Sequence, residues 1–410
     1  MQEDTFVIYA NAVSLWDHTN GASKSIKLLL ESLAQAGCHV TAIMGCTSDC
    51  EEGFKTSQRI WLDQSSGREE RHKTKSIKCN GVNYSLIATE HWSRKYLAAD
   101  EQEQIYRLSQ KAIKEGSEHY TKKIFIGWGN LLLEEAIFKE AKKSDYTLLF
   151  YLANPSYFGK NTETLRLTDK IITDSFATKE LYLGEPGLPN IHVIPKCVEP
   201  PEFITEAILN WEAQTILFVN PKLKKGLEAL ISIAIILEER KPNVKIKIID
   251  AGNQMPGQLK MLGAAIDDLP KNILIESGQA NADEVFKDVT VLLLLSLWHE
   301  SGSRLIHESH LRGVPALAFR TGGSAELIGK IDQDLFDKPS TKDINGQPKI
   351  QNWNPEKLIN RIIELTSDFN LYAKHSGALL KRADELICNN SLAAEEILRA
   401  CEDSALLHMN

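Results

Sequence analysis

Short apolar runs alternate with amphipathic segments along the first half of the chain. The first run is Thr5-Phe-Val-Ile-Tyr-Ala, and polar residues, glycine or proline bound each run. A segment from about Ala22 to Ala36 has apolar residues at helical spacing, and the next run covers Cys38 to Met44. Because these runs are apolar throughout rather than alternating, they predict strands of a parallel sheet covered on both faces. Further strands are predicted at 123–126, 146–152, 170–173 and 191–194.

The pattern stops at Pro195-Lys-Cys-Val-Glu-Pro-Pro201 and then starts again. This stretch has three prolines in seven positions, so it predicts a linker between domains. After Asn354 only helical patterns follow, from Pro355 to Thr366 and from Tyr372 to Leu407. The strands predicted between the linker and these helices lie at 215–219, 244–249, 272–275, 290–295 and 315–319.

Together these patterns predict an α/β protein with two Rossmann-like, doubly wound domains and a C-terminal helical tail. A chain of 410 residues exceeds the size at which single cores stop growing, roughly 250 to 300 residues. We expect an N-terminal domain over 1–198 and a C-terminal domain over 199–370 that face each other across a cleft. The helices over 371–410 are expected to pack across both domains.

The charge balance argues against a nucleic-acid partner. The chain has 55 acidic and 47 basic side chains, so its formal net charge of -8 would repel a phosphate backbone. No apolar run is long enough to span a bilayer, and the first residues lack the pattern of a secretory signal. The seven cysteines are scattered without a CxxC pair, which is typical of reduced thiols. We therefore expect a cytoplasmic protein, with the inner face of a membrane as the alternative location.

A basic cluster from Arg68 to Lys78 is the one segment that bears on membrane contact. We interpret it first as a solvated loop. The alternative is peripheral contact with an anionic lipid surface or with an acidic acceptor, and the two glutamates within the cluster weaken the membrane alternative.

Three loops of the second domain follow predicted strands, where open α/β sheets bind their ligands. Asn220-Pro-Lys-Leu-Lys-Lys-Gly226 leads three lysines into a helix start, where free N–H groups favour an anion. Glu300 and Glu308 lie eight residues apart, and Ser303 is the predicted N-cap of the helix that carries Glu308. Arg320-Thr-Gly-Gly-Ser-Ala-Glu326 is glycine-rich, so its N–H groups can approach a phosphate closely. Each loop alone has an ordinary structural explanation, but the three together predict a site for a nucleoside diphosphate sugar.

The order and spacing of these residues resemble the donor-site signature of retaining glycosyltransferases of the GT-B fold, family 4. That signature combines a Glu-x7-Glu, a Gly-x-Pro-x strand and a Gly-Gly-x-x-Glu turn. The matching residues here are Glu300 and Glu308, Gly313-Val-Pro-Ala, and Gly322-Gly-Ser-Ala-Glu326. The segment Asn20-Gly-Ala-Ser-Lys24 is similar to the family's first glycine loop, so the resemblance extends to the N-terminal half.

The resemblance implies transfer of a hexose from a nucleoside diphosphate sugar to a hydroxyl acceptor with retention of configuration. The acceptor would be a glycan, a lipid-linked sugar or a small molecule, and no cofactor or obligatory metal is implied. Glu300 would contact the transferred sugar, Lys225 would neutralise the diphosphate and Glu308 would hold the ribose. The other donor-binding candidates are Asn220, Lys222, Gly302, Ser303, Arg304, Gly322 and Gly323. The candidates on the acceptor side are His18, Asn20, Gly21, Trp128 and Asn154.

The chain also departs from the family pattern. Asn220 stands where the family usually has an arginine, and Ala153 stands where many members have a histidine. Because the charge of the leaving diphosphate has to be balanced, we expect Lys222, Lys224 or Arg304 to substitute for the missing arginine.

These departures leave a second class of function open, a catalytically silent GT-B partner that binds or stabilises another glycosyltransferase. The presence of both Glu300 and Glu308 argues against it, because a scaffold needs neither. A dinucleotide-dependent oxidoreductase is disfavoured, because no GxGxxG follows the first predicted strand.

Overall fold

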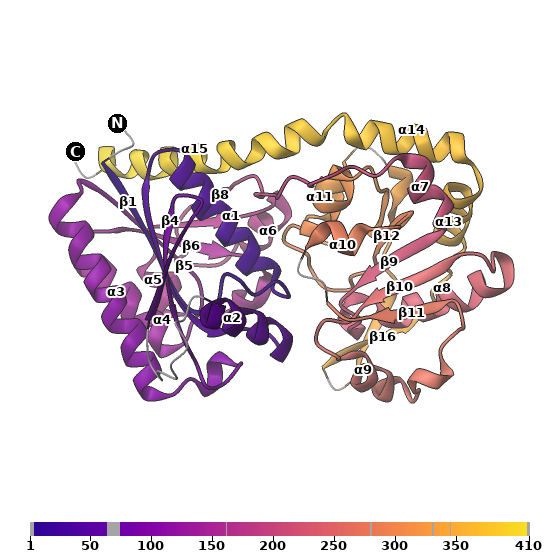
Figure 1. Cartoon of the computed structure of the whole chain (residues 1–410), viewed down its shortest axis with the longest axis horizontal. Coiled ribbons are helices and arrows are strands. Elements are labelled where there is room, and N and C mark those ends of the chain that lie inside the picture. Colours follow the sequence, from indigo (N-terminus) through magenta and orange to yellow (C-terminus); the bar gives the residue numbers. More distant parts are fainter. Residues whose placement is uncertain are drawn as a thin grey trace. The chain divides into compact units, whose positions relative to one another are not determined.

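The computed structural model describes residues 4–63, 74–160, 162–278, 281–329, 332–344 and 346–407. The chain divides into two compact units, which we call unit 1 (Met1–Cys197 with Cys388–Asn410) and unit 2 (Val198–Ile387). Each unit is built on a mainly parallel sheet with helices packed against it (Figure 1). The predicted class, an α/β protein with two doubly wound domains and a helical C-terminal tail, is confirmed.

The sheet of unit 1 has the strand order β3-β4-β2-β1-β5-β6-β7-β8 among the described residues. All neighbours pair in parallel except β3 and β4, which form an antiparallel hairpin. The strands are β1 Thr5–Val13, β2 His39–Thr47, β3 Thr74–Cys79, β4 Val82–Ile87, β5 Lys122–Gly127, β6 Thr147–Leu152, β7 Lys170–Thr173 and β8 Ile191–Val193. The helices are α1 Gly21–Gln35, α2 Glu51–Asp63, η1 Arg94–Tyr96, α3 Ala99–His119, α4 Leu132–Lys143, η2 Pro155–Tyr157, α5 Glu163–Leu167 and α6 Phe176–Tyr182.

The loop interpretation of the basic cluster is wrong for its described part. Residues 74–78 belong to β3, while the rest of the cluster lies outside the described residues. The hairpin turns at Asn80-Gly81, where both residues have positive φ, and Asn-Gly is the strongest short hairpin signal. Lys75 lies over the ring of Trp61 at 5.4 Å, so part of the positive charge is used within the unit.

The sheet of unit 2 has the order β11-β10-β9-β12-β13-β14, and every described pair in it is parallel. Along β9, Ile216 and Phe218 pack into one apolar core and Leu217 into another, so both faces of the sheet are covered. The strands are β9 Thr215–Val219, β10 Lys245–Ile249, β11 Ile273–Glu276, β12 Val291–Leu294, β13 Ala316–Phe319, β14 Leu335–Phe336, β15 Ser340–Ile344 and β16 Gln347–Gln351. The helices are α7 Ala207–Glu212, η3 Leu223–Lys225, α8 Leu227–Arg240, α9 Met255–Leu262, η4 Ile266–Asp268, α10 Ala282–Phe286, α11 Arg304–Leu311, α12 Ser324–Ile328 and η5 Asp332–Asp334.

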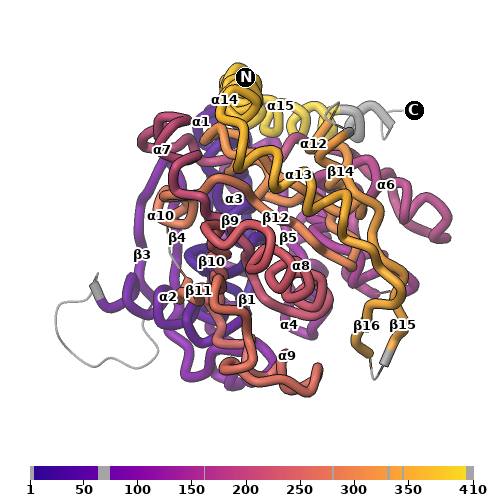
Figure 2. Tube along the Cα trace, turned by 90° about the vertical axis from the view of Figure 1, so that its right-hand side faces the viewer, coloured from indigo at the N-terminus to yellow at the C-terminus, as the bar shows by residue number. Residues whose placement is uncertain are grey.

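The C-terminal part of the chain is helical, as the pattern predicts. A hairpin precedes these helices. The antiparallel hairpin of β15 and β16 projects from unit 2 at the lower right of Figure 2 and was not predicted, because most of its residues are polar. The helices are α13 Glu356–Ser367, α14 Phe369–Leu380 and α15 Ala383–Leu407. Ala393, Ala394 and Ile397 of α15 pack into the core of unit 1. In the described part of the chain no helix has the length and apolar character needed to cross a membrane.

Candidate functional site

The sheet of unit 2 changes its winding direction between β9 and β12. In chain order its strands read 3-2-1-4-5-6, so the chain leaves β9 toward one edge and returns at β12 toward the other. Ligands of doubly wound sheets bind at the carboxyl ends of the two strands flanking such a switch point. The loops that follow β9, β12 and β13 therefore define the candidate site in unit 2.

The loop after β9 is folded tightly around Gly226. Asn220 begins it in the left-handed conformation, with φ of 66°, and η3 carries Lys224 and Lys225. Gly226 has φ of 93°, and a Cβ on it would lie 2.1 Å from the carbonyl oxygen of Leu295. Only glycine satisfies both the positive φ and this close approach, so the start of α8 is held directly against the end of β12.

The loop after β12 is joined to the first loop by backbone and side chain. The Leu297 N–H donates to the carbonyl oxygen of Lys224 at 2.9 Å. The Lys224 ammonium lies 4.3 Å from the ring centroid of Trp298. Lys225 Nζ and Glu300 Oε1 form an ion pair and hydrogen bond, and the two side chains are 23% and 12% exposed. The structure thus brings together Lys225 and Glu300, which the family resemblance assigns to the diphosphate and to the transferred sugar.

The loop after β13 is joined to the second loop at Glu300. The Gly323 N–H donates to the carbonyl oxygen of Glu300 at 2.7 Å. Gly322 has φ of 50°, and a Cβ there would lie 2.1 Å from the same carbonyl oxygen. The three predicted loops are therefore one connected assembly, with Glu300 at its centre.

Helix α11 starts directly after the second loop and carries the other predicted acidic residue. Ser303 occupies its N-cap position as predicted, although its side chain makes no capping hydrogen bond. Arg304 Nε lies 3.5 Å from Glu308 Oε1, with side chains 15% and 5% exposed. Arg304 Nε and Nη1 are buried and make no hydrogen bond within the described residues. A cation with unused donors thus lies in the first turn of α11, where an anionic group is also favoured by the helix.

Two residues that the sequence did not single out anchor α11. Arg312 donates from Nη1 to the Glu308 carbonyl oxygen at 3.0 Å and from Nε to Asp283 Oδ1 at 2.8 Å. Arg312 and Asp283 are both buried, so this pair fixes the helix to α10. An arginine at the C-terminal end of a helix commonly bonds to the last carbonyl groups, so the contact with Glu308 had a local signal, whereas the pairing with Asp283 depends on the fold.

His299 precedes Glu300 in the second loop and is half-buried. Burial lowers the pKa of its imidazole below the ordinary value, and the nearby carboxylates of Glu300 and Glu326 act in the opposite direction. The lowered pKa favours a neutral ring at pH 7, which adds a hydrogen-bonding group rather than a charge.

The acceptor-side candidates after β1 lie at the start of α1 in unit 1. Asn20 is the N-cap of α1, since its Oδ1 accepts from the N–H groups of Ala22 and Ser23. Its Nδ2 donates to Asp49 Oδ2 at 2.9 Å, so both polar atoms of the amide have partners within unit 1. Gly21 is exposed with open space where a Cβ would be, and His18 is half-buried in the loop before it.

The two remaining acceptor-side candidates follow β5 and β6. Trp128 is 8% exposed, and its indole N–H donates to the Tyr9 hydroxyl at 2.9 Å. The guanidinium of Arg94 lies 5.3 Å from the Trp128 ring centroid and covers one face. Asn154 caps η2 through a 2.8 Å hydrogen bond from the Ser156 N–H. The structure therefore uses both side chains to shape the loops at this edge of the sheet.

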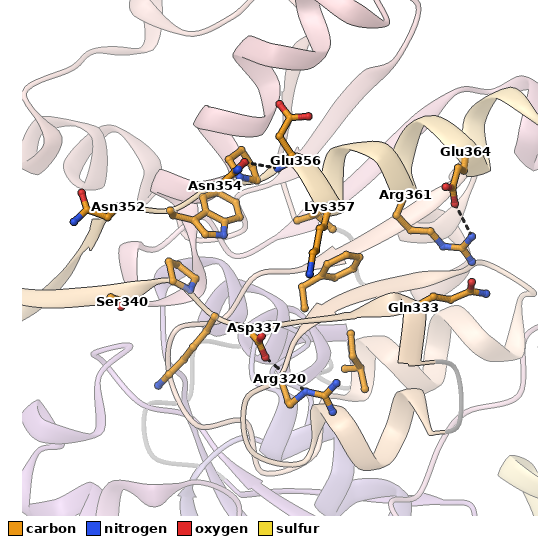
Figure 3. Close-up of a pocket in the computed structure, with 17 residues that line it drawn as sticks. Arg320, Gln333, Asp337, Ser340, Asn352, Asn354, Glu356, Lys357, Arg361 and Glu364 are labelled. Carbon is orange, nitrogen blue, oxygen red and sulfur yellow. Dashed lines mark hydrogen bonds and ion pairs between the residues drawn. The ribbon is translucent and has the colours of Figure 1, made fainter.

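A groove of about 780 Å³ lies beside β14 in unit 2 (Figure 3). Its lining mixes cations and carboxylates, and all three of the carboxylates have cationic partners. Glu356 pairs with Arg240, Glu364 with Arg361, and Asp337 lies 3.9 Å from Arg320. This mixed lining gives the groove no dominant charge.

No protein-family model matches the chain, and no curated protein sequence does. Solved structures do match over nearly the whole length. HepE from Anabaena, in complex with UDP-glucose, is 15% identical, with 96% of this chain and 99% of that chain covered and a TM-score of 0.65. The trehalose-6-phosphate synthase OtsA is 12% identical, with 97% and 98% covered and a TM-score of 0.61.

A third similar structure is an α,α-trehalose-phosphate synthase (UDP-forming) from Burkholderia xenovorans in complex with glucose-6-phosphate. It is 11% identical, with 97% of this chain and 99% of that chain covered and a TM-score of 0.60. Together with the two doubly wound units, these similarities show that the chain has the GT-B fold of glycosyltransferases.

Proposed function

We propose that this protein is a glycosyltransferase that moves a hexose from a nucleoside diphosphate sugar to a hydroxyl acceptor, with retention of configuration. The observation that carries the proposal is the connected assembly of three loops in unit 2. Hydrogen bonds from Leu297 to Lys224 and from Gly323 to Glu300 hold these loops at the switch point of the sheet. The similar structures of HepE and of the trehalose-phosphate synthases support the same class of reaction.

In this proposal the cationic groups of the assembly bind and stabilise the diphosphate. Departure of a nucleoside diphosphate develops negative charge on its oxygen, and fixed positive charge nearby lowers that barrier. Lys225 is the main cation that neutralises the diphosphate. Arg304 supplies the second positive charge, which Asn220 cannot supply. The Nε and Nη1 atoms of Arg304 are buried and make no hydrogen bond within the described residues. Lys225 pairs with Glu300, and a diphosphate at this position would compete for the ammonium and release the carboxylate toward the sugar.

Glu308 is assigned to the ribose and unit 1 to the acceptor. An ionised carboxylate only accepts hydrogen bonds, which suits vicinal hydroxyl groups. Since Asn20 and Trp128 are engaged within unit 1, their role toward an acceptor would be to shape its loops. The proposal includes no obligatory metal, so transfer should persist in the presence of EDTA.

The decisive experiment measures binding of UDP-, GDP- and ADP-sugars to the full chain. UDP-glucose is the first donor to test, because HepE was solved with it. We expect one donor class to bind, with release of the nucleoside diphosphate once a suitable acceptor is added. Glu308→Ala serves as the site control, and the anomeric configuration of the product tests retention. An absence of binding to every donor would leave the silent GT-B partner, which Asn220 and Ala153 favour, as the better proposal.

A second experiment locates the compensating charge. Alanine variants of Lys222, Lys224, Lys225 and Arg304 are compared for turnover at saturating donor. The proposal expects the largest loss for Lys225 and a smaller loss for Arg304. Unchanged turnover in all four would show that other groups balance the diphosphate.

A further inference from the structure

The outer strands of the two sheets differ in how they resist pairing with another chain. An edge strand presents unpaired N–H and C=O groups, and proteins protect such edges with lysines, prolines or very short strands. Strand β3 carries Lys75 and Lys78, β8 has three residues, and β14 has two residues followed by Asp337 and Lys338. Strand β11 is also short, with four residues, but Ile273-Leu274-Ile275 contains no lysine or proline, and in the described residues only β10 pairs with it.

The apolar side chains of β11 are exposed on both faces of the sheet. Leu274 is 45% exposed and Ile275 is 41% exposed. Adjacent residues of a strand point to opposite faces, so the two side chains leave apolar surface in water on each face. Such exposure is unfavourable in proportion to its area, and a partner strand along this edge would reduce it on both faces.

Pairing with β10 determines which backbone groups of β11 point outward. The N–H of Ile246 donates to the Asn272 carbonyl oxygen at 2.8 Å, and the N–H of Asp250 donates to the Glu276 carbonyl oxygen at 2.9 Å. In a parallel pair the alternate residues bond to the neighbouring strand, so Ile273 and Ile275 direct their N–H and C=O groups away from β10. The edge therefore offers two outward donors and two outward acceptors within three residues.

We propose that two copies of this chain associate by antiparallel pairing of their β11 strands. The two-fold axis passes through Leu274, which lies opposite the partner's Leu274 in a non-hydrogen-bonded pair. Ile273 lies opposite the partner's Ile275 and exchanges both backbone hydrogen bonds with it, and the symmetry repeats this pair. Every apolar side chain of the edge then has an apolar neighbour across the interface.

The sequence of β11 selects this register over its neighbours. After a shift by one residue, the backbone groups that point away from β10 in one copy would lie opposite residues whose groups point toward β10 in the other. Such residues cannot form hydrogen bonds with each other across the interface. Shifts by two residues would place Leu274 opposite Asn272 or opposite Glu276. In the proposed register Glu276 lies opposite Asn272 and Lys271 lies opposite Ser277, so no like charges meet.

The size of the interface predicts a weak dimer. Stable interfaces bury about 1,200–2,000 Å² in total, and a single pair of four-residue strands buries less than that. We therefore expect a reversible equilibrium between monomer and dimer that depends on protein concentration.

Sedimentation equilibrium of the full chain over a concentration series tests the association. We expect the average mass to rise with concentration, and Leu274→Lys to weaken the dimer by at least about tenfold, because two ammonium groups then meet at the axis. Ile235→Lys is the matched control, since Ile235 is 50% exposed on α8 of the same unit and lies outside the edge. A monomer at every concentration, or a dimer that Leu274→Lys leaves unchanged, would overturn the proposal.

Disulfide trapping tests the register. Cα atoms of a non-hydrogen-bonded pair lie about 4.5 Å apart, which suits a disulfide, so Leu274→Cys should cross-link two copies under mild oxidation. Ile273→Cys should not, because its own copy lies two positions away along the partner strand. The wild type is oxidised in parallel to account for the native cysteines. Cross-linking at 273 but not at 274 would exclude this register.

Discussion

The carboxyl edges of the two sheets are built from the same kind of loops, but they use their polar side chains differently. In unit 2, Lys225, Glu300 and Arg304 face other charged groups of the assembly or are left with unused donors. In unit 1, Asn20 and Trp128 donate hydrogen bonds to other residues of the same unit, to Asp49 and Tyr9. Both edges are shaped by a switch point, at β9 and β12 in one unit and at β1 and β5 in the other.

This difference separates two requirements of a binding site. An anion-binding site needs positively charged side chains and hydrogen-bond donors at fixed positions. Other groups, which do not themselves contact the anion, have to hold these side chains in place. In unit 2, close backbone contacts at Gly226 and Gly322 hold the loops in place, and the charged side chains pair with one another, Lys225 with Glu300 and Arg304 with Glu308. At the unit 1 candidates named from the sequence, the polar side chains themselves hold the loops. We therefore expect binding of the sugar donor to depend on unit 2.

The largest effect should come from Lys225→Ala. Removing a cation that stabilises a leaving diphosphate should lower kcat by roughly 10²–10³-fold. The free energy of unfolding should also fall, because the Glu300 carboxylate is only 12% exposed and loses its ion-pair partner. Steady-state kinetics and urea unfolding measure the two quantities. Lys245→Ala, at the exposed start of β10, is the control, and an equal loss in both variants would contradict the assignment.

Gly322→Ala should test how much the backbone contacts between the loops contribute, since it changes no charged side chain. The new Cβ meets the Glu300 carbonyl oxygen and the residue has positive φ, so we expect the free energy of unfolding to fall by about 1–3 kcal/mol. Donor affinity should fall as well, because Glu300 is displaced.

Gly263→Ala is the matched control for this variant. Gly263 also has positive φ, but nothing lies within 4 Å of its Cβ position. Denaturant unfolding and donor titration of both variants isolate the close contact. Equal donor affinities in the two would show that the third loop is not part of the donor site.

Arg304→Met should produce a smaller and more selective change. The variant keeps most of the apolar length of the side chain but loses the charge beside Glu308, so we expect the donor KM to rise by about tenfold, or ~1.4 kcal/mol. Because Arg304 is also proposed to stabilise the leaving group, kcat should fall while the donor KM rises. Arg304→Lys should recover part of the loss, whereas an unchanged KM in Arg304→Met would remove this residue from the donor site.

Asn20→Ala should give the smallest effect, and it should appear in stability. Loss of the N-cap of α1 should lower the free energy of unfolding by ~1 kcal/mol and leave the donor affinity unchanged. Asp368→Ala, which removes the N-cap of α14, is the matched control. A weaker donor affinity in Asn20→Ala alone would show that unit 1 contributes to donor binding and would break the comparison between the two edges.

The sequence alone determined the class of fold and the central strands. Buried parallel strands are apolar throughout, so the pattern predicted β1, β2, β5 to β8 and β9 to β13. Strands β3 and β4 were missed although Asn80-Gly81 signals a hairpin, because the many lysines and arginines of this segment favour a solvated loop. Strands β14 to β16 were missed because β14 has two residues and most residues of the hairpin of β15 and β16 are polar.

The sequence also identified the three loops of the candidate site, because charged residues and glycines directly after a predicted strand can be recognised from the sequence alone. Only the tertiary structure decided how the loops are joined, since the contacts of Lys224 with Leu297 and of Gly323 with Glu300 link distant segments. The same holds for Trp128, whose burial under Arg94 no local pattern reveals. It holds for β11 too, whose apolar residues predicted a covered strand, while its place at the edge of the sheet leaves them exposed. Periodicity reports the local environment that a segment prefers, whereas partners and edges depend on the order in which the strands assemble.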